Sequence, residues 1–307
     1  GSLGDFRKGV NVIIHEDVVL PDIDWVYIPA GEFLMGSKDS DQYASEEEKP
    51  QHLDYLQGYW ISRFPITNAQ FLPFVVGKCY EKKEYWTDAG WEWLEEIRRI
   101  REEEPHKKPM RYPDKPYGWN LSTYRISNRP VVGISWYEAY AYSSWLQDKY
   151  LESNFYFLQD KRKFFINIPS EEQWEKAFRG VSGLIYPWGN QWDYDKANIS
   201  EEKLQTTSTV GMFPKGKSKD FGLLDGIGNV IEWTSTPFGN YQDEPICVYP
   251  NHLDNMSIKE KEKYHFFIMR GACILDNKNE ARCASRGISA CLACGLNFGF
   301  RLCLIHR

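Results

Sequence analysis

The sequence predicts an α+β fold in which two helices lie on small antiparallel sheets and long ordered loops join the elements. Three observations support this class. A hairpin pattern near the N-terminus is followed by helical patterns, the chain after residue 186 is rich in glycine, asparagine, aspartate and short apolar runs, and no internal repeat occurs. Separate helical and strand regions are typical of α+β domains. We therefore expect a single domain over residues 25–307, preceded by an N-terminal extension over residues 1–24.

The first part of the chain carries both strand and helix signals. In residues 25–37, "WVYIPAGEFLMGS", two apolar runs flank a Pro-Ala-Gly turn, which predicts a β-hairpin. Residues 58–75 predict a strand that ends near Pro65 and a helix capped by Thr67 or Asn68. A further helix is indicated in the middle of residues 80–109, which end in a charged run.

The middle of the chain carries two more helix signals. Residues 129–150 begin as an apolar strand and take a helical pattern from about Ser135. Ser170, with Gln173 three residues later, forms a capping box for an amphipathic helix that Gly180 can end. Short strands and long ordered loops are expected from there to the C-terminus.

Composition excludes several function classes. A hydrophobic share of 42% with 26% charged residues is typical of a soluble globular protein, and the 16% aromatic share can fill a core or line a binding face. The net charge of -6, without a Lys/Arg stripe, argues against a nucleic-acid partner. No apolar run is long enough for a membrane span. Any membrane anchor would therefore lie outside this chain, which begins with Gly1-Ser2.

Cysteines are concentrated near the C-terminus. The chain has seven, an odd number that excludes complete pairing within it. Cys291 and Cys294 form a C-x-x-C pair, which is typical of a redox dithiol or half of a zinc site. A second ligand pair and a helix-capping signal are both missing nearby, and the histidines form no i, i+4 pair. We therefore expect free thiols that behave as small apolar side chains.

Eight landmarks in order, "YIPAGEFLMGS", "ITNAQF", "RPVVGISWYEAYAYSSWL", "IPSEEQWEKAFRG", "YPWGN", "GNVIEWT", "MRGA" and "GFRL", span most of the chain. Together they resemble the formylglycine-generating enzyme and sulfatase-modifying-factor family. The resemblance implies a C-type-lectin-type fold elaborated with loops. It also implies a structural calcium loop in "LLDGIGNVIEWT", with carboxylates from Asp225 and Glu232 and carbonyls from Gly228 and Val230. The alternative is a turn in which Glu232 caps or forms a salt bridge.

The same resemblance argues against catalysis. Enzymes of the family use two cysteines, located shortly after the glycines of the "RGG" strand, to bind copper and oxidise a substrate cysteine. The matching segment here, "GACILDNKNEAR", is shorter, and residues 276–281 contain no cysteine. We therefore expect no catalytic residue and no catalytic cofactor.

Residues 281–307 have an unusual composition. They contain no Lys, Glu, Gln, Met or Trp, although these five types make up about a quarter of the chain. None of the five has a codon ending in C or T, so the bias is the one expected if adenines of template codons such as AAC were replaced. Diversity-generating retroelements act in this way, and the chain resembles their variable proteins, which often share this fold.

This resemblance implies a hypervariable segment over residues 272–298 that displays changing side chains on a fixed frame. The predicted display positions are Cys273, Ile274, Leu275, Cys283, Ser285, Gly287, Ile288, Ser289, Cys291, Leu292, Cys294, Leu296 and Phe298. The predicted frame is Arg270, Gly271, Arg282, Arg286, Gly299, Phe300 and Arg301, whose arginines can donate several hydrogen bonds to loop carbonyls.

These inferences predict a non-catalytic, receptor- or adhesin-like protein. It would bind an unknown protein or cell-surface ligand through residues 273–298 and reach a bacterial cell surface by an anchor outside this chain, with a cytoplasmic location as the alternative. Two other functions stay open: a formylglycine-generating-type copper oxidase with relocated cysteines, and a non-catalytic module that assembles with a cellular partner, such as a kinase-linked one.

Overall fold

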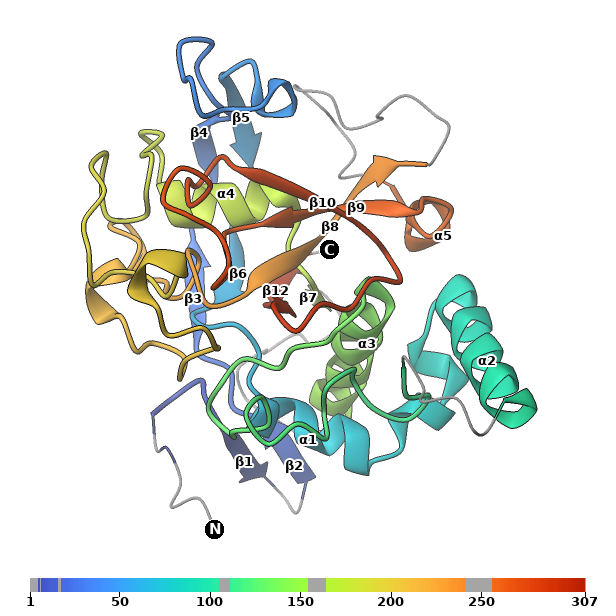
Figure 1. The fold of residues 1–307 in the computed structure, drawn as a ribbon. Helices are drawn as coiled ribbons and strands as arrows, with labels where there is room; N and C mark the ends of the chain where they lie inside the picture. Colours follow the sequence, from blue (N-terminus) through green and yellow to red (C-terminus); the bar gives the residue numbers. More distant parts are fainter. Residues whose placement is uncertain are drawn as a thin grey trace.

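The computed structural model describes residues 5, 7–15, 18–104, 111–153, 164–240 and 256–306. Helices and small sheets are interspersed with long loops (Figure 1), which confirms the predicted mixture of helix and sheet. The helices are α1 (Asn68–Val76), α2 (Asp88–Glu103), α3 (Trp136–Glu152), α4 (Glu171–Arg179) and α5 (Ile258–Lys261). The strands are β1 (Val12–His15), β2 (Val18–Pro21), β3 (Trp25–Ile28), β4 (Gly31–Met35), β5 (His52–Leu56), β6 (Tyr59–Ser62), β7 (Phe164–Asn167), β8 (Ile231–Gly239), β9 (Phe266–Arg270), β10 (Arg286–Ala290), β11 (Phe298–Gly299) and β12 (Cys303–His306).

The strands form two four-stranded sheets and two two-stranded ones. One four-stranded sheet has the order β3-β6-β12-β7 and is antiparallel, with Cys303 of β12 opposite Ile61. The other has the order β10-β9-β8-β11 and is antiparallel except for the short β11, which runs parallel to β8. β1 pairs with β2, and β4 pairs with β5. The C-terminal part of the chain therefore contributes to both larger sheets.

The hairpin predicted over residues 25–37 is wrong. β3 and β4 occupy this stretch, but β3 pairs with β6 and β4 pairs with β5. The chain turns at Gly31, whose φ of 141° suits a residue without a side chain. Each strand therefore finds its partner further along the chain, where β6 is held on its other side by β12.

The strand predicted at the start of residues 129–150 is also wrong, although its apolar residues are buried. The N–H of Val131 donates to the C=O of Ile66, and the N–H of Gly133 donates to the C=O of Gly295. Gly133 has a φ of 73°, which interrupts an extended backbone. The segment is thus an irregular connector that links α1 to the loop after β10.

The predicted helix starts are confirmed, because each rests on a local cap. Thr67, Ser135 and Ser170 are the N-caps of α1, α3 and α4, and each side chain accepts a hydrogen bond from the backbone three residues later. Gly180 ends α4 with a φ of 68°. α2 confirms the helix predicted within residues 80–109, of which residues 105–109 lie outside the described part.

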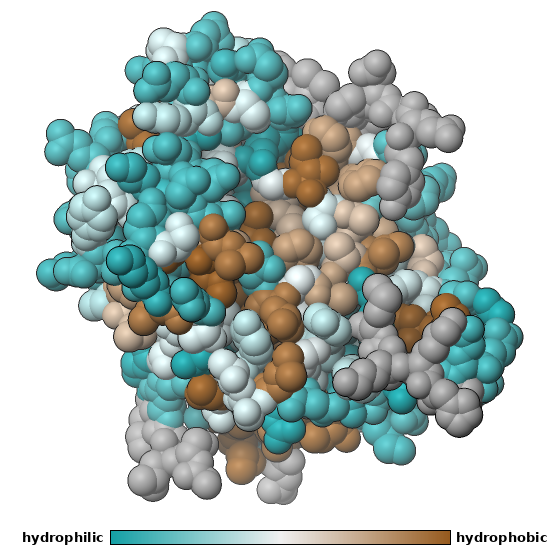
Figure 2. Space-filling model, in the orientation of Figure 1, coloured by the Kyte–Doolittle hydropathy of each residue, from teal (hydrophilic) through white to brown (hydrophobic). Residues whose placement is uncertain are grey.

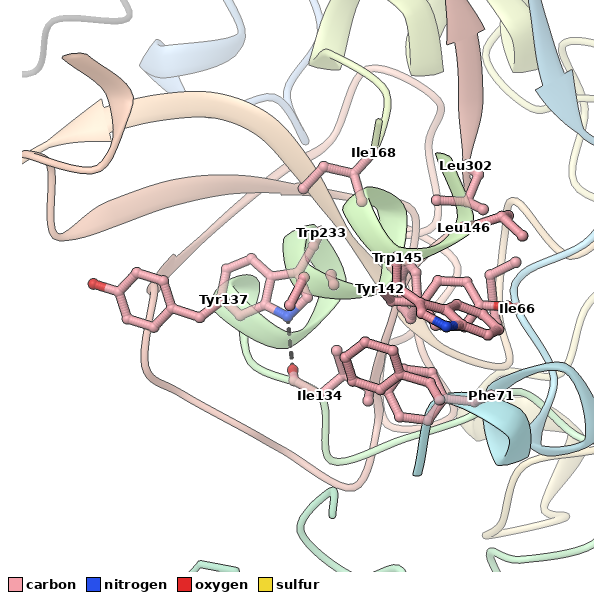
Figure 3. Close-up of a cluster of buried hydrophobic side chains, with 14 of the residues drawn as sticks. Ile66, Phe71, Ile134, Tyr137, Tyr142, Trp145, Leu146, Ile168, Trp233 and Leu302 are labelled. Atoms are coloured by element: carbon pink, nitrogen blue, oxygen red, sulfur yellow. Dashed lines mark hydrogen bonds between the residues drawn. The ribbon is translucent and has the colours of Figure 1, made fainter. Parts of the chain in front are cut away.

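Two apolar clusters lie on the two faces of the β3-β6-β12-β7 sheet. The larger cluster is rich in aromatic side chains from α1, α3 and β8, including Phe71, Tyr142, Trp145 and Trp233 (Figure 3). The indole N–H of Trp233 donates to the C=O of Ile134 in this cluster. The smaller cluster contains Trp174 and Phe178 of α4. Much of the aromatic content of the chain therefore serves the core.

The residues before β3 pack against the rest of the fold. β2 contacts α1 and α3, and Leu20 and Ile23 belong to the larger apolar cluster. The domain boundary predicted between residues 24 and 25 stays a prediction. Among the described helices, none has the length and apolar character required to cross a membrane.

Candidate functional site

The predicted variable segment begins and ends in the β10-β9-β8-β11 sheet. It leaves β9 at Gly271, forms a loop, returns as β10 beside β9, and continues through a second loop to β11 (Figure 1). Arg286 lies opposite Arg270, and Ala290 lies opposite Phe266. Because both loops start and end in one sheet, their ends are held by backbone pairing that does not depend on side-chain identity.

Three predicted display residues face solvent. The exposed fractions are 69% for Leu275, 42% for Ile288 and 43% for Leu292. Six others are partly exposed, namely Ser285, Gly287, Ser289, Cys294, Leu296 and Phe298. Figure 2 shows apolar residues gathered across the middle of the face over which this segment runs, with hydrophilic residues around them.

Four predicted display residues are buried, and the prediction of display needs correction for them. Cys283 lies in the smaller apolar cluster, and Cys291 lies in the larger one, where its thiol contacts the hydroxyl of Tyr137 at 3.2 Å. Cys273 and Ile274 are also buried. The composition bias marks a whole stretch of codons, whereas these four residues lie in the loops and turns next to β9 and β10, where the path of the backbone directs their side chains into the protein.

Arg270 links the segment to α4. Its side chain is fully buried and forms ion pairs with Glu171 at 2.9 Å and Glu175 at 2.7 Å. The same guanidinium donates to the carbonyls of Cys283 and Ser285, each at 3.3 Å. A charge buried in this way needs partners on every side, and here the partners include the loop itself.

Arg282 and Arg286 hold the loop against the N-terminal half of the chain. Arg282 forms an ion pair with the buried Glu48 at 2.6 Å and donates to the carbonyl of Tyr43. Arg286 pairs with Glu171 at 2.8 Å and donates to the carbonyl of Glu47. Arg282 also donates to the carbonyl of Asn279 within the segment, whereas the carbonyl partner of Arg286 lies outside it. The role of these arginines as a frame for a variable surface stays a prediction.

Arg301 holds the end of the segment. Its guanidinium is fully buried, forms an ion pair with Glu232 at 2.6 Å, and donates to the carbonyls of Ser62, Arg63 and Leu224. Next to it, Phe300 is buried among aromatic side chains of α1 and α3, and Gly299 lies against Val230 and Val131. At the other end, Gly271 has a φ of 82°, and a Cβ there would lie 2.4 Å from the carbonyl oxygen of Gly226.

Residues that the sequence pattern does not indicate complete the exposed surface. Asn297 donates from its amide to the sulfur of Cys273 at 3.0 Å and so joins the two loops. Leu296 lies over Gly118, where an added Cβ would come within 2.3 Å of the leucine side chain. Tyr117 and Leu121, beside Gly118, are 37% and 49% exposed. Neither lies in the variable segment, and only their position in the fold brings them to this surface.

The predicted calcium ligands are already engaged. Both carboxylate oxygens of Glu232 accept hydrogen bonds from Arg301, and one also accepts from the indole of Trp174. The carbonyl of Gly228 accepts from Val230, and Asp225 accepts from the N–H of Gly211, while burial raises the pKa of Asp225 to about 6. Calcium takes roughly six to eight oxygen ligands. This arrangement fits the salt-bridge alternative, and calcium stays a prediction.

The family model described as "Sulfatase-modifying factor enzyme 1-like domain" matches residues 14–305. The chain belongs to this family. Since the match extends over nearly all of the chain, the resemblance inferred from the eight landmarks is confirmed.

Relatives of this family domain include proteins named as an enzyme, as an inactive form of that enzyme and as a protein kinase. The inactive C-alpha-formylglycine-generating enzyme 2 of Bos taurus is 29% identical, over 70% of this chain and 71% of the relative. The formylglycine-generating enzyme of Mus musculus is 25% identical, over 92% and 75%. The serine/threonine-protein kinase pkn1 of Chlamydia caviae is 26% identical over 91% of this chain, which spans only 37% of that relative.

Two solved structures share the fold of the family domain. PvdO from Pseudomonas aeruginosa superposes with a TM-score of 0.61 and 20% identity, covering 97% of this chain and 99% of that one. Treponema denticola variable protein 1 superposes with a TM-score of 0.58 and 17% identity, covering 95% and 98%. The predicted similarity to a variable protein therefore extends over the whole fold.

The described thiols of this family domain are buried or partly buried and form no disulfide with one another. Within the described ranges, no group of three or more His, Cys, Asp and Glu side chains could hold a metal ion. Burial raises the pKa of Cys273 and of Cys294 to about 11, and it also raises the pKa of Cys283 and Cys291. The thiolate that nucleophilic or redox chemistry requires is therefore disfavoured.

We expect Cys273 and Cys294 in the folded protein to react with iodoacetamide at neutral pH at least about 100-fold more slowly than in the unfolded chain, because their pKa is raised by about two units. The rate should rise with pH towards about 11. The stability contributed by the neutral thiols should be lost over the same rise, since the folded pKa exceeds the unfolded one. Mass spectrometry of timed samples, with a denatured sample as control, measures this. Rapid alkylation of either folded thiol would contradict it.

Proposed function

We propose that this domain is a non-catalytic ligand-binding protein and that residues 272–298 form its diversified binding surface. The observation that carries the proposal is a separation of roles within residues 270–301, which include the segment and its two ends. Arg270, Arg282 and Arg301 are buried and bonded to elements outside the segment, whereas Leu275, Ile288 and Leu292 are exposed. Side chains at the exposed positions can change without removing a contact that holds the backbone.

The surface suits a partner with apolar groups. Exposed apolar side chains that gather on one face usually mark a binding site, and Tyr117 and Leu121 extend this surface beyond the segment. The relative named inactive and the structural likeness to a variable protein are consistent with binding without catalysis. Display at a bacterial cell surface is part of the proposal and comes from the sequence resemblance.

The encoding locus gives the direct test of diversification. We expect a reverse-transcriptase gene nearby and a near-repeat of the codons for residues 272–302 that differs from them only at adenines. Sequencing of the locus measures both features. If neither is present, the retroelement part of the proposal is excluded.

The protein itself provides a second test. We expect Leu275→Ser, Ile288→Ser and Leu292→Ser each to change the free energy of unfolding by no more than about 0.5 kcal/mol, because these side chains are largely exposed. The matched control is Cys283→Ser, which places a hydroxyl in an apolar cluster and should cost about 1–3 kcal/mol. Urea unfolding measures all four variants. If the exposed variants lost as much free energy of unfolding as the control, these residues would serve packing and not display.

A second candidate function has support from the kinase-named relative. Its match covers 91% of this chain, so the domain could serve as a non-catalytic module that binds a cellular partner. The encoding locus distinguishes the two, since a module of this kind needs no template repeat. The copper-oxidase alternative is tested by incubating the protein with copper and a sulfatase peptide containing cysteine, from which we expect no aldehyde product.

A further inference from the structure

β10 is an outer strand of its sheet. The order β10-β9-β8-β11 leaves one side of β10 without a neighbouring strand among the described residues. The N–H of Cys291 donates to the C=O of His265, the pair that follows Ala290 and Phe266 in the antiparallel register. Backbone groups alternate in direction along such a strand, so those of Gly287 and Ser289 face β9 and those of Ile288 face away.

The outward N–H and C=O of Ile288 are available for pairing, whereas the outward C=O of Ala290 accepts from the N–H of Ala293. No described residue forms a hydrogen bond with the N–H or C=O of Ile288. Natural edge strands are usually blocked by proline, lysine, a bulge or a covering segment. The sequence of β10, "RGISA", has no proline or lysine, and its regular register shows no bulge. Its one charged side chain, Arg286, is bound to Glu171 and to the carbonyl of Glu47. The opposite edge strand, β11, has only two residues.

We propose that β10 accepts an extended peptide segment of a partner protein as an added strand, with an apolar side chain of that peptide against Ile288. Unsatisfied backbone donors and acceptors at a strand edge are matched by another extended backbone, which supplies the same groups at the same spacing. The inference rests on the proposed function, because β10 lies inside the diversified surface.

This mode of binding is compatible with variable side chains. Backbone hydrogen bonds at Ile288 form with any side chain except that of proline, which lacks the N–H, so they provide an anchor that is largely independent of the residue displayed. The exposed side chains of Ile288 and Leu292 then select among peptides. A diversified surface would in this way change its specificity without losing its basic affinity for extended chains.

The probe for this inference is a phage-displayed library of random dodecapeptides, selected on the intact chain. The best peptide is then synthesised with a single N-methyl group at each position in turn. We expect affinity to fall by about tenfold or more at alternate positions only, because an added strand points every second N–H towards β10. Uniform losses, or none, would overturn strand addition, and so would a selection that yields no binding peptide.

Two variants of the protein test the same edge. Ile288→Pro removes the outward N–H without removing a bond to β9, and it should lower the affinity for the selected peptide by about tenfold or more. Ile288→Ala keeps the N–H and should lower this affinity by less. Circular dichroism checks that both fold, and if the proline variant does not, the N-methyl series alone decides. A concentration-dependent dimer that Ile288→Pro abolishes would assign the edge to a second copy and overturn the peptide assignment.

Two outcomes distinguish strand addition from the proposed binding surface. If Leu292→Ser lowers the affinity for the peptide but the N-methyl series shows no alternation, the binding surface is supported and strand addition is excluded. If no substitution in residues 272–298 changes the affinity for a selected peptide, both strand addition and the proposed binding surface are excluded.

Discussion

Replacing Arg301 with methionine is expected to destabilise the protein by about 3–5 kcal/mol, because it leaves the carboxylate of Glu232 buried without its charged partner. Four backbone carbonyls, of Ser62, Arg63, Leu224 and Asp225, also lose a donor. The guanidinium further lies over the ring of Phe178, 4.6 Å from its centroid. Denaturant unfolding of the variant and the parent measures the difference.

The matched control for this prediction is Arg99→Met. Arg99 also bonds to two carboxylates, of Glu96 and Glu103, but it lies on α2 with its side chain 56% exposed. Exposed ion pairs contribute at most about 1 kcal/mol. Combining Arg301→Met with Glu232→Gln should recover part of the loss, since no unpaired charge remains. If the Arg301 and Arg99 variants were equally stable, the structural role given to Arg301 would be wrong.

Replacing Arg270 with methionine is expected to have a comparable cost, about 3–5 kcal/mol, with a local effect on the binding surface. Glu171 and Glu175 are both fully buried and would lose a shared partner. The carbonyls of Cys283 and Ser285 would lose their donor as well. Amide hydrogen exchange over residues 283–290 should therefore accelerate, in addition to the loss of global stability measured by unfolding.

The local effect on amide exchange distinguishes a residue that holds the segment in place from an ordinary core residue. Phe74→Ala is a suitable control, because Phe74 is fully buried in the larger cluster among side chains of α1 and α3, and its loss should cost about 3–5 kcal/mol. At conditions of equal global stability, exchange over residues 283–290 should be faster in the Arg270 variant than in the Phe74 variant. Equal exchange rates would show that Arg270 supports the whole fold and not the segment in particular.

Sequence patterns predicted the helices of this protein well and the strands poorly. Ser135 and Ser170 cap α3 and α4 through bonds to residues three positions later, so the signal and the structure lie within one turn of chain. β3 and β4 were predicted to pair with each other, yet Tyr27 lies opposite Trp60 and Phe33 lies opposite Asp54. A strand can pair with any edge of compatible pattern, and only the assembled sheet selects one.

In the candidate site, too, some features follow from the sequence pattern and others only from the fold. Arg270, Arg282 and Arg301 were predicted as frame residues from their place in the family pattern, and each is buried and bonded to the chain around it. Cys283 and Cys291 were predicted as displayed, but they face the two apolar clusters. The composition bias identifies a stretch of chain, and it carries no information on which face each residue takes.

The sequence by itself determined the family, the helix starts and the absence of cysteine from residues 276–281. These features depend on residue identity or on contacts within a few positions. Only the tertiary structure decided which strands pair, which predicted display positions face solvent, and that Tyr117 and Leu121 join the surface. The physical reason is distance along the chain: the ion pair of Arg282 with Glu48 joins residues 234 positions apart, and such contacts exist only after the chain has folded.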